Sequence, residues 1–338
     1  MRKILKFIEV TTVSLVVVAL ISVNASAVTT TLQPPSKDAY VDQQNPTTNF
    51  GSATSLFIDG KTPGASAKLI RTFIAFDLSS APSGSIINSA KLQLFIYNAP
   101  AVTVPLETHR ITDSWTEAGI TWDNQPANTS LATTENSTGT TNNIFLSFDI
   151  TTDVQAFVDG TATNNGWRIA DKNEGTTGGG DRLTKFCSKE ATTSDPDSDC
   201  TTERLPKLDI DYTLPLCELT ATGSPAFGSL NPEDTAGDGQ KTSLENTGNV
   251  GINSLSIKGD TWNQVGNGAT MTVGQTKWAL SDGQDYDSSM TTLTDSDVSL
   301  GITPFAPSDT QDVFFKVRIL PDQPAGNYEQ IITFTFEC

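Results

Sequence analysis

The sequence has little of what most enzymes need at a catalytic centre. It contains one histidine, His109, and neither a GxSxG nor an HExxH motif. A Ser-His-Asp arrangement and a histidine-based metalloprotease site therefore lack their parts. Acidic residues are plentiful, but no pattern singles out a pair of carboxylates for glycoside hydrolysis. We therefore predict no catalytic residues and a protein that is not an enzyme.

Positive charge is scarce as well. The chain has 21 Lys and Arg against 39 Asp and Glu, a formal net charge of −18. Proteins bind nucleic acid largely by releasing counterions from phosphates with Lys and Arg, so this balance argues against a nucleic-acid partner. It disfavours an anionic membrane surface for the same reason. The simplest interpretation is that the acidity keeps the protein soluble.

Long apolar runs are missing, apart from one near the start of the sequence. Three basic residues precede the apolar stretch Val13–Val23, and Ala25-Ser26-Ala27 follows it. This order is typical of a secretory signal peptide, here residues 1–27. The stretch spans eleven residues, whereas a membrane helix needs roughly 20. An uncleaved anchor is the alternative. We predict a secreted, extracellular protein without membrane insertion of the mature chain, with cell-surface association as a further option.

Cysteine is limited to four residues, an even number that suits two disulfides in an exported protein. Cys187 and Cys200 flank a stretch too polar to hold itself in place, which favours a local bridge. A Cys217–Cys338 bridge would join the two ends of the last third of the chain. Crossed pairings stay open. A zinc site is disfavoured, because the spacings are wrong and His109 lies far away in sequence.

Helical periodicity is almost absent, and 151–160 is the one plausible helical turn. Alternating apolar and polar residues occur instead, for example over 72–78, 91–97, 206–212 and 313–319. Such alternation is typical of half-buried strands, and turn residues separate the segments at short intervals. The pattern predicts an all-β fold made of sandwiches.

The mature chain is too long for one ordinary sandwich, so we expect two. A strand ends near Pro215, just before Cys217, which places the boundary there. We therefore predict a signal peptide at 1–27 and domains at 28–213 and 214–338.

Residues 30–213 closely resemble the DNRLRE domain, a family of extracellular β-sandwich modules classed among carbohydrate-binding modules. The resemblance rests on these segments, in this order: DAYVDQQNPTTNFG (38–51), RTFIAFDLSSAPSGSIINSAKLQLFIY (71–97), HRITDSWTEAGITWDNQP (109–126), FDITTDVQAFVDG (148–160), NNGWRIAD (164–171) and FCSKE with RLPKLDIDY (186–212). The name-giving string does not occur; the region that should carry it, 178–190, is modified and holds a cysteine. The resemblance implies a jelly roll and a non-catalytic role, since such modules are often joined to polysaccharide-degrading enzymes or cell-surface proteins. Residues 214–338 are more loosely similar to immunoglobulin-like domains of exported prokaryotic surface proteins, which implies a fold and no function.

Candidate ligand-binding residues follow from two kinds of chemistry. Sugar rings pack on exposed aromatic faces, and Arg forks onto carboxylates in a bidentate manner. Trp115 and Trp122 lie in one polar segment, where they either form a platform or anchor a loop to the core; anchoring is the simpler interpretation, and we expect Trp122 and Ile120 to share a strand face. The candidates for the site are Arg71, His109, Arg110, Trp115, Arg182 and Lys185, with Lys189 and Trp167 as further options. For each cation, an ordinary salt bridge is the alternative.

No cofactor follows from the sequence, although a structural calcium ion has two candidate sites. Asp195, Asp197 and Asp199 alternate within the predicted Cys187–Cys200 loop, and alternating carboxylates suit a hard, oxygen-seeking ion. A solvated turn is the alternative. Asp38 and Asp42 form the other pair.

Two glycosylation sequons begin at Asn128 and Asn136 in a polar stretch that we expect to be an exposed loop.

The sequence thus predicts a secreted, non-catalytic protein that binds an extracellular or cell-surface polysaccharide, such as a cell-envelope glycan, through its N-terminal sandwich. The alternative is a structural or adhesive surface protein that assembles with copies of itself.

Overall fold

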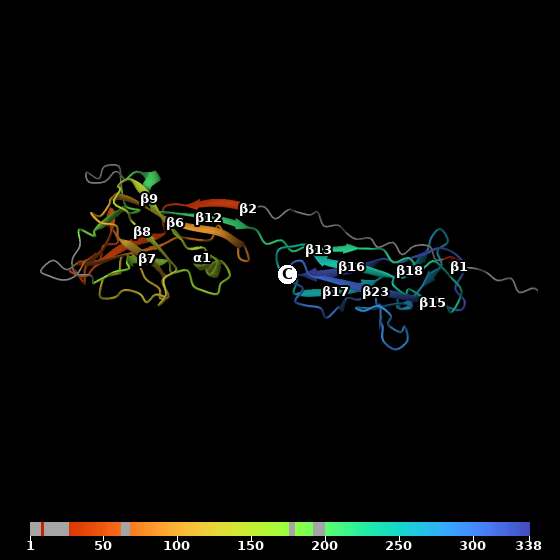
Figure 1. Ribbon diagram of the computed structural model, residues 1–338. Coiled ribbons are helices and arrows are strands. Elements are labelled where there is room, and N and C mark those ends of the chain that lie inside the picture. Colours follow the sequence, from red (N-terminus) through yellow and green to blue (C-terminus); the bar gives the residue numbers. More distant parts are fainter. Residues whose placement is uncertain (1–7, 10–26, 62–67, 176–179, 192–199) are drawn as a thin grey trace, which may run out of the picture. The chain divides into compact units, whose positions relative to one another are not determined.

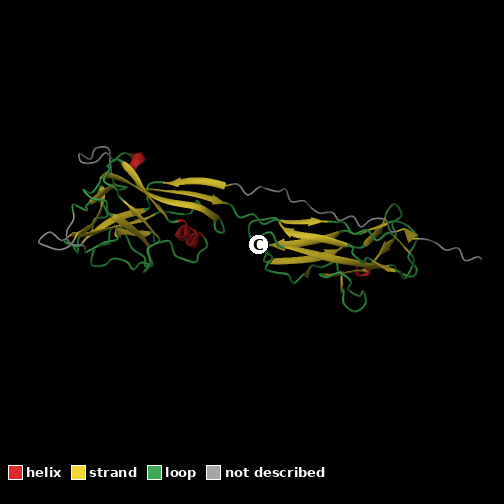
Figure 2. Cartoon of the chain, in the orientation of Figure 1, coloured by secondary structure: helices red, strands yellow, loops and turns green. Residues whose placement is uncertain are grey.

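The protein is described from a computed structural model, which covers residues 8–9, 27–61, 68–175, 180–191 and 200–338. The chain forms two compact units (Figure 1). Within the described residues, one unit comprises 27–214, and the other comprises Pro215–Cys338 together with Ile8–Glu9. Nearly all regular elements are strands (Figure 2), so the predicted all-β fold is confirmed.

All strand pairs in the first unit are antiparallel. Its elements are β2 (Ala27–Leu32), β3 (Lys37–Asp42), β4 (Ser55–Lys61), β5 (Lys68–Ala75), β6 (Ile86–Asn98), β7 (Pro105–Arg110), β8 (Thr134–Ser137), β9 (Ile144–Asp149), α1 (Thr151–Val158), β10 (Trp167–Asp171), β11 (Thr184–Cys187), a 3-10 turn (Thr202–Arg204) and β12 (Lys207–Thr213). The predicted helical turn at 151–160 is α1, whereas β8 lies inside the stretch expected to be a loop around Asn136.

One strand connects the two layers of this unit. The first layer runs β2-β12-β6-β11-β4, with β9 beside β6, and the second runs β4-β5-β10-β7-β8, with β3 beside β5. The first half of β4 pairs with β11 through Ser55–Ile58, and its second half pairs with β5 through Asp59–Lys61. The layers are therefore joined by continuous backbone hydrogen bonding.

The main core of the first unit lies between these layers, and the alternating residues fill it. Leu92, Leu94 and Ile96 of β6 face Ile74 of β5 and Trp167 of β10 across the core, all fully buried. Period-two alternation puts every second side chain of a strand on one face. The sequence pattern was therefore a sound guide to this face of each sheet.

The opposite face of β5 is also buried, which the sequence did not predict. Phe73 and Ala75 pack with Ala39 and Val41 of β3 in a second, smaller core. The segment 113–126 closes this core from outside, and it contributes Trp115 and Ile120. Segment 113–126 contains no strand, so the expected strand through Ile120 and Trp122 was wrong.

The second unit is also built from antiparallel strands around a core of its own. Its elements are β1 (Ile8–Glu9), β13 (Leu219–Thr222), β14 (Ser229–Leu230), β15 (Thr235–Ala236), β16 (Lys241–Asn246), β17 (Ser254–Gly259), β18 (Trp262–Gln264), β19 (Thr270–Met271), a 3-10 turn (Val273–Gln275), β20 (Thr276–Ala279), β21 (Thr291–Thr292), β22 (Val298–Ser299), β23 (Thr310–Arg318), β24 (Tyr328–Glu329) and β25 (Ile332–Glu337). One sheet has the order β13-β16-β23-β20-β21 and another β22-β17-β25. A further sheet has the order β19-β18-β24, and Phe315 and Trp262 are fully buried in the core of this unit. The immunoglobulin-like architecture stays a prediction.

Both predicted disulfides are present, Cys187–Cys200 and Cys217–Cys338. The first closes a local loop, and the second joins the two ends of Pro215–Cys338. Among the described residues, no helix is long and apolar enough to cross a membrane.

Candidate carbohydrate-binding site

Trp115 fastens segment 113–126 to the second layer of the sandwich. Its side chain is 8% exposed, and its indole N–H donates a hydrogen bond of 2.8 Å to the carbonyl of Asn165. Phe73 meets its ring edge-on, and the Lys37 ammonium lies 4.2 Å from the ring centre. A ring covered on these sides has little surface left for a sugar. The structure thus favours the interpretation of Trp115 as an anchor.

Trp122 occupies a different environment, at the end of the same segment. Its ring is half-buried, and the Arg71 guanidinium lies 4.6 Å from the ring centre. Gln125 links the two residues, because it donates to the Trp122 carbonyl at 2.8 Å and accepts from Arg71 Nη1 at 3.0 Å. An aromatic ring, a guanidinium and a side-chain amide therefore lie together at the surface.

Arg71 is held in place by an acidic partner. Its Nε and Nη2 donate to the two carboxylate oxygens of Glu174 at 2.7 and 2.5 Å. Both side chains keep about a fifth of their surface exposed, at 21% and 20%. The predicted salt-bridge alternative is therefore realised, and it leaves the guanidinium accessible beside Trp122.

Arg168 extends this surface onto the neighbouring strand β10. Arg168 of β10 is in register with Phe73 of β5 on one side and with His109 of β7 on the other. Its Nη2 lies 3.4 Å from Oε1 of Glu107, and its buried Nε has no hydrogen-bond partner among the described residues. Burial lowers the pKa of Arg168, and the charge of Arg71 lowers it further. The two guanidiniums are therefore near enough to repel each other.

His109 is 5% exposed, and each of its ring nitrogens lies close to an oxygen atom. Nδ1 lies 2.7 Å from the Thr129 carbonyl, and Nε2 lies 2.9 Å from Oε1 of Glu107. The contact of Nε2 with Glu107 does not have the geometry of a hydrogen bond, and the buried ring of His109 does not reach the exposed surface. We call the set Arg71, Trp122, Gln125, Arg168 and Glu174 the arginine face.

Arg110 lies apart from the arginine face, because successive residues of β7 point to opposite sides of the sheet. Its Nη1 is 3.5 Å from Oδ1 of Asp153 on α1. Arg110 lines a surface depression of about 400 Å³ together with Leu131, which is 82% exposed, and several hydroxyl groups. Trp167 is fully buried and donates to the same Asp153 at 2.9 Å. Trp167 is therefore a core residue.

Arg182 and Lys185 do not belong to the arginine face. Arg182 forms two hydrogen bonds, of 2.6 and 2.7 Å, with the fully buried carboxylate of Asp171. Lys185 of β11 lies in the first layer, whereas the arginine face lies on the second, and its ammonium is 6.0 Å from the ring centre of Phe57. The structure therefore does not bring all six candidates together, and their role in ligand binding stays a prediction. Alternation placed each residue on a face but could not show which faces share a layer.

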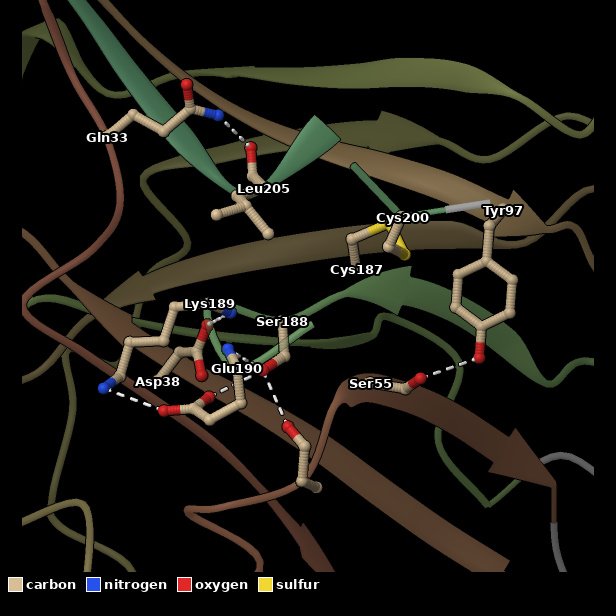
Figure 3. Close-up of a disulfide and its surroundings, with 11 residues drawn as sticks. Gln33, Asp38, Ser55, Tyr97, Cys187, Ser188, Lys189, Glu190, Cys200 and Leu205 are labelled. Atoms are coloured by element: carbon tan, nitrogen blue, oxygen red, sulfur yellow. Dashed lines mark hydrogen bonds and ion pairs between the residues drawn. A yellow bond between two sulfur atoms is a disulfide. The ribbon is translucent and has the colours of Figure 1, made fainter. Parts of the chain in front are cut away.

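Three acids form a cluster, and Figure 3 shows two of them, Asp38 and Glu190, near the Cys187–Cys200 disulfide. Carboxylate oxygens of Asp38, Glu117 and Glu190 lie within 4.8 Å of one another. Lys189 binds two of these acids, with Nζ 3.0 Å from Glu117 and 2.8 Å from Glu190. Burial raises the pKa of Asp38 well above its usual range, and the carboxylates of Glu190 and Glu117 raise it further.

The predicted calcium ligands Asp195, Asp197 and Asp199 lie outside the described residues. Asp42, the other predicted partner of Asp38, caps its own turn by accepting from the Gln44 backbone N–H and the Asn45 amide, both at 2.9 Å. It is four residues from Asp38 on β3, about 13 Å along a strand. Asp38 and Asp42 therefore do not form one site.

A comparison with protein families decides what kind of module the first unit is. The family model of carbohydrate-binding module family 96 matches residues 29–201, just over half of the chain. The protein belongs to this family. The match supports the predicted carbohydrate-binding type of module, although not the DNRLRE name in particular. A search of curated proteins found no match.

Within the family 96 module, the sequence missed three parts of the arginine face, Gln125, Arg168 and Glu174. Arg168 was passed over in favour of Trp167, although the alternation of Trp167 and Ile169 already placed it on the outer face with Arg71. Glu174 carried no signal, because its pairing with Arg71 depends on a turn that follows β10. Carbohydrate binding is a general property of such modules, and the geometry supplies a candidate surface for it.

Proposed function

We propose that the family 96 module binds an extracellular polysaccharide without acting on it chemically, and that the arginine face is its binding surface. The contact between Arg71 and the half-buried ring of Trp122 carries the proposal. Binding of sugars requires an apolar face for the C–H groups of the ring and polar groups that fix the orientation. Both lie within this one cluster.

The partners of Arg71 indicate how a sugar would be held. Glu174 and Gln125 accept hydrogen bonds from the guanidinium, and each retains oxygen lone pairs that can accept from a sugar hydroxyl. A uronic acid carboxylate would have to compete with Glu174 for the Arg71 fork. The surface therefore suits hydroxyl-rich sugars with or without acidic groups. If Glu174 stays paired with Arg71, sugars with acidic groups will bind more weakly at low salt than at moderate salt.

The full chain without residues 1–27 provides the test, on a panel of immobilised neutral and uronic-acid polysaccharides. We expect retention on at least one of them, and Arg71→Ala and Trp122→Ala should each weaken it about tenfold or more, as truncation of a central Arg or Trp commonly does. Lys172→Ala is the matched control. Lys172 pairs with Glu135 at 2.6 Å with 45% of its side chain exposed, and it makes no described contact with Trp122 or Arg71.

Arg110→Ala distinguishes the two surfaces of the module. It should leave retention unchanged if the arginine face binds the glycan. Loss of retention in Arg110→Ala, with Arg71→Ala unaffected, would move the site to the depression beside Asp153. No retention of the wild-type chain on any polysaccharide, together with oligomers that grow with concentration, would favour the assembling surface protein instead.

The proposed location is outside the cell. The proposed partners are polysaccharides of the cell envelope or of the medium. Two disulfides support it, because they persist in oxidising compartments. Residues 1–27 would direct export as a signal peptide.

A further inference from the structure

We propose that Asp38, Glu117 and Glu190 bind a divalent cation of the calcium type, which would be a site separate from the arginine face. The three residues come from β3, from segment 113–126 and from the turn after β11. Their carboxylate oxygens converge to within 4.8 Å of one another. Calcium ligands at 2.3–2.6 Å from an ion are roughly this far apart or closer.

The second observation is an oxygen atom without a partner. Asp38 is 1% exposed, and its Oδ2 accepts a hydrogen bond of 2.9 Å from the Lys189 backbone N–H. Its Oδ1 is buried and accepts no hydrogen bond from any described residue. In Figure 3 the Asp38 carboxyl lies next to that of Glu190. A buried carboxylate oxygen is costly unless a proton, a donor or a metal ion satisfies it.

The charge of the cluster also calls for a cation. The cluster holds three carboxylates, and the Lys189 ammonium, which pairs with Glu117 and Glu190, is the cation in contact with it among the described residues; its formal charge is −2. The Lys37 ammonium also interacts electrostatically with Glu117, but its Nζ donates to the Trp115 carbonyl at 2.9 Å. A divalent cation balances this charge, whereas one proton shared by Asp38 and Glu190 would leave half of it.

The donor set selects the kind of ion. All three candidate ligands are carboxylates, and hard cations such as calcium prefer oxygen, whereas zinc and copper favour nitrogen and sulfur. Calcium takes six to eight oxygens, so waters and carbonyl groups would complete the shell. The backbone around Glu117 is packed tightly, since a Cβ on Gly51 would lie 2.2 Å from the Glu117 carbonyl oxygen.

Bound calcium would tie segment 113–126 to the sandwich. Glu117 already accepts a hydrogen bond of 2.7 Å from the Asp38 backbone N–H. An ion shared with Asp38 and Glu190 would add a second link at the same place. Because Trp115 and Trp122 both belong to this segment, the cation would stabilise the support of the arginine face without touching it.

The test uses the full chain, stripped with a chelator and titrated with calcium chloride, magnesium chloride and terbium chloride. We expect one calcium per chain to be retained after dialysis. The melting temperature of the module should rise by roughly 5–10 °C at a hundredfold excess over the dissociation constant. Terbium should show luminescence sensitised by Trp115, which lies two residues from Glu117.

Variants separate the site from adventitious binding. Glu190→Gln and Asp38→Asn should each weaken calcium binding at least tenfold. Glu135→Gln is the matched control, because Glu135 is an exposed carboxylate paired with Lys172, and it should bind calcium as the wild type does. Lys189→Gln should bind calcium more tightly, because it removes the one positive charge in contact with the cluster. Replacement of a lysine with a purely structural role would not increase the affinity for calcium.

The proposal fails if calcium and the chelator leave the melting temperature of the wild type unchanged and no terbium luminescence appears. Asp38 and Glu190 then share a proton. The wild-type titration decides the matter even if an acidic-cluster variant does not fold.

Discussion

Arg182→Met is expected to destabilise the family 96 module by about 3–5 kcal/mol, because it strands a buried carboxylate. Asp171 has a side chain with 0% exposure, and the Arg182 guanidinium binds both of its oxygens. A Cβ on Gly60 would lie 2.2 Å from Asp171 Oδ2, so the carboxylate has no room to swing out towards water. Urea unfolding followed by tryptophan fluorescence measures the loss.

The double variant Arg182→Met with Asp171→Leu is the control for this prediction. Replacing a whole buried ion pair by apolar side chains is often neutral, whereas removing one partner is costly. The double variant should therefore regain most of the lost stability. Polysaccharide retention per folded molecule should be unchanged in Arg182→Met. Wild-type stability combined with lost retention would contradict the structural assignment and return Arg182 to the ligand site.

Replacing Cys217 and Cys338 by serine is expected to cost the second unit about 4–5 kcal/mol. The bridge joins residues 121 positions apart, and in the chain-entropy model a loop of this length gives about this stabilisation. Thermal unfolding under non-reducing conditions measures the change. Addition of a reductant to the wild type should reproduce the effect on the second unit.

Retention on polysaccharide provides the control for this disulfide. Both cysteines lie in the second unit, so the variant should bind polysaccharide as the wild type does. Equal melting temperatures of the second unit with and without the bridge would show that the unfolded chain is already constrained in another way.

The strands of the core could be predicted from the sequence because their information is local. The alternation of Leu92, Leu94 and Ile96 predicts a buried face of the strand independently of the rest of the chain. The Cys187–Cys200 pairing could be predicted from equally local information, because the stretch between the two residues is too polar to be held in place without a disulfide. These features depend on residues within about a dozen positions of each other.

The burial of the outer face of β5 could not be predicted in this way. Phe73 is covered because Trp115 folds back over it from a segment about forty residues later. The acidic cluster is even harder to predict from the sequence, because Asp38, Glu117 and Glu190 are far apart in the chain. Arg182 was a ligand candidate with a salt bridge as the alternative, and the sequence could not show that the salt-bridge partner is Asp171. Only the fold shows which charges meet and which are buried.

The division of β4 between the two layers has a consequence for motion. Sliding one layer over the other would break backbone hydrogen bonds on both sides of the junction between Ile58 and Asp59. Amide protons around this junction should therefore exchange with deuterium only when the whole module opens. Any movement during ligand binding would then be confined to side chains and to segment 113–126, while the strands beneath them do not move.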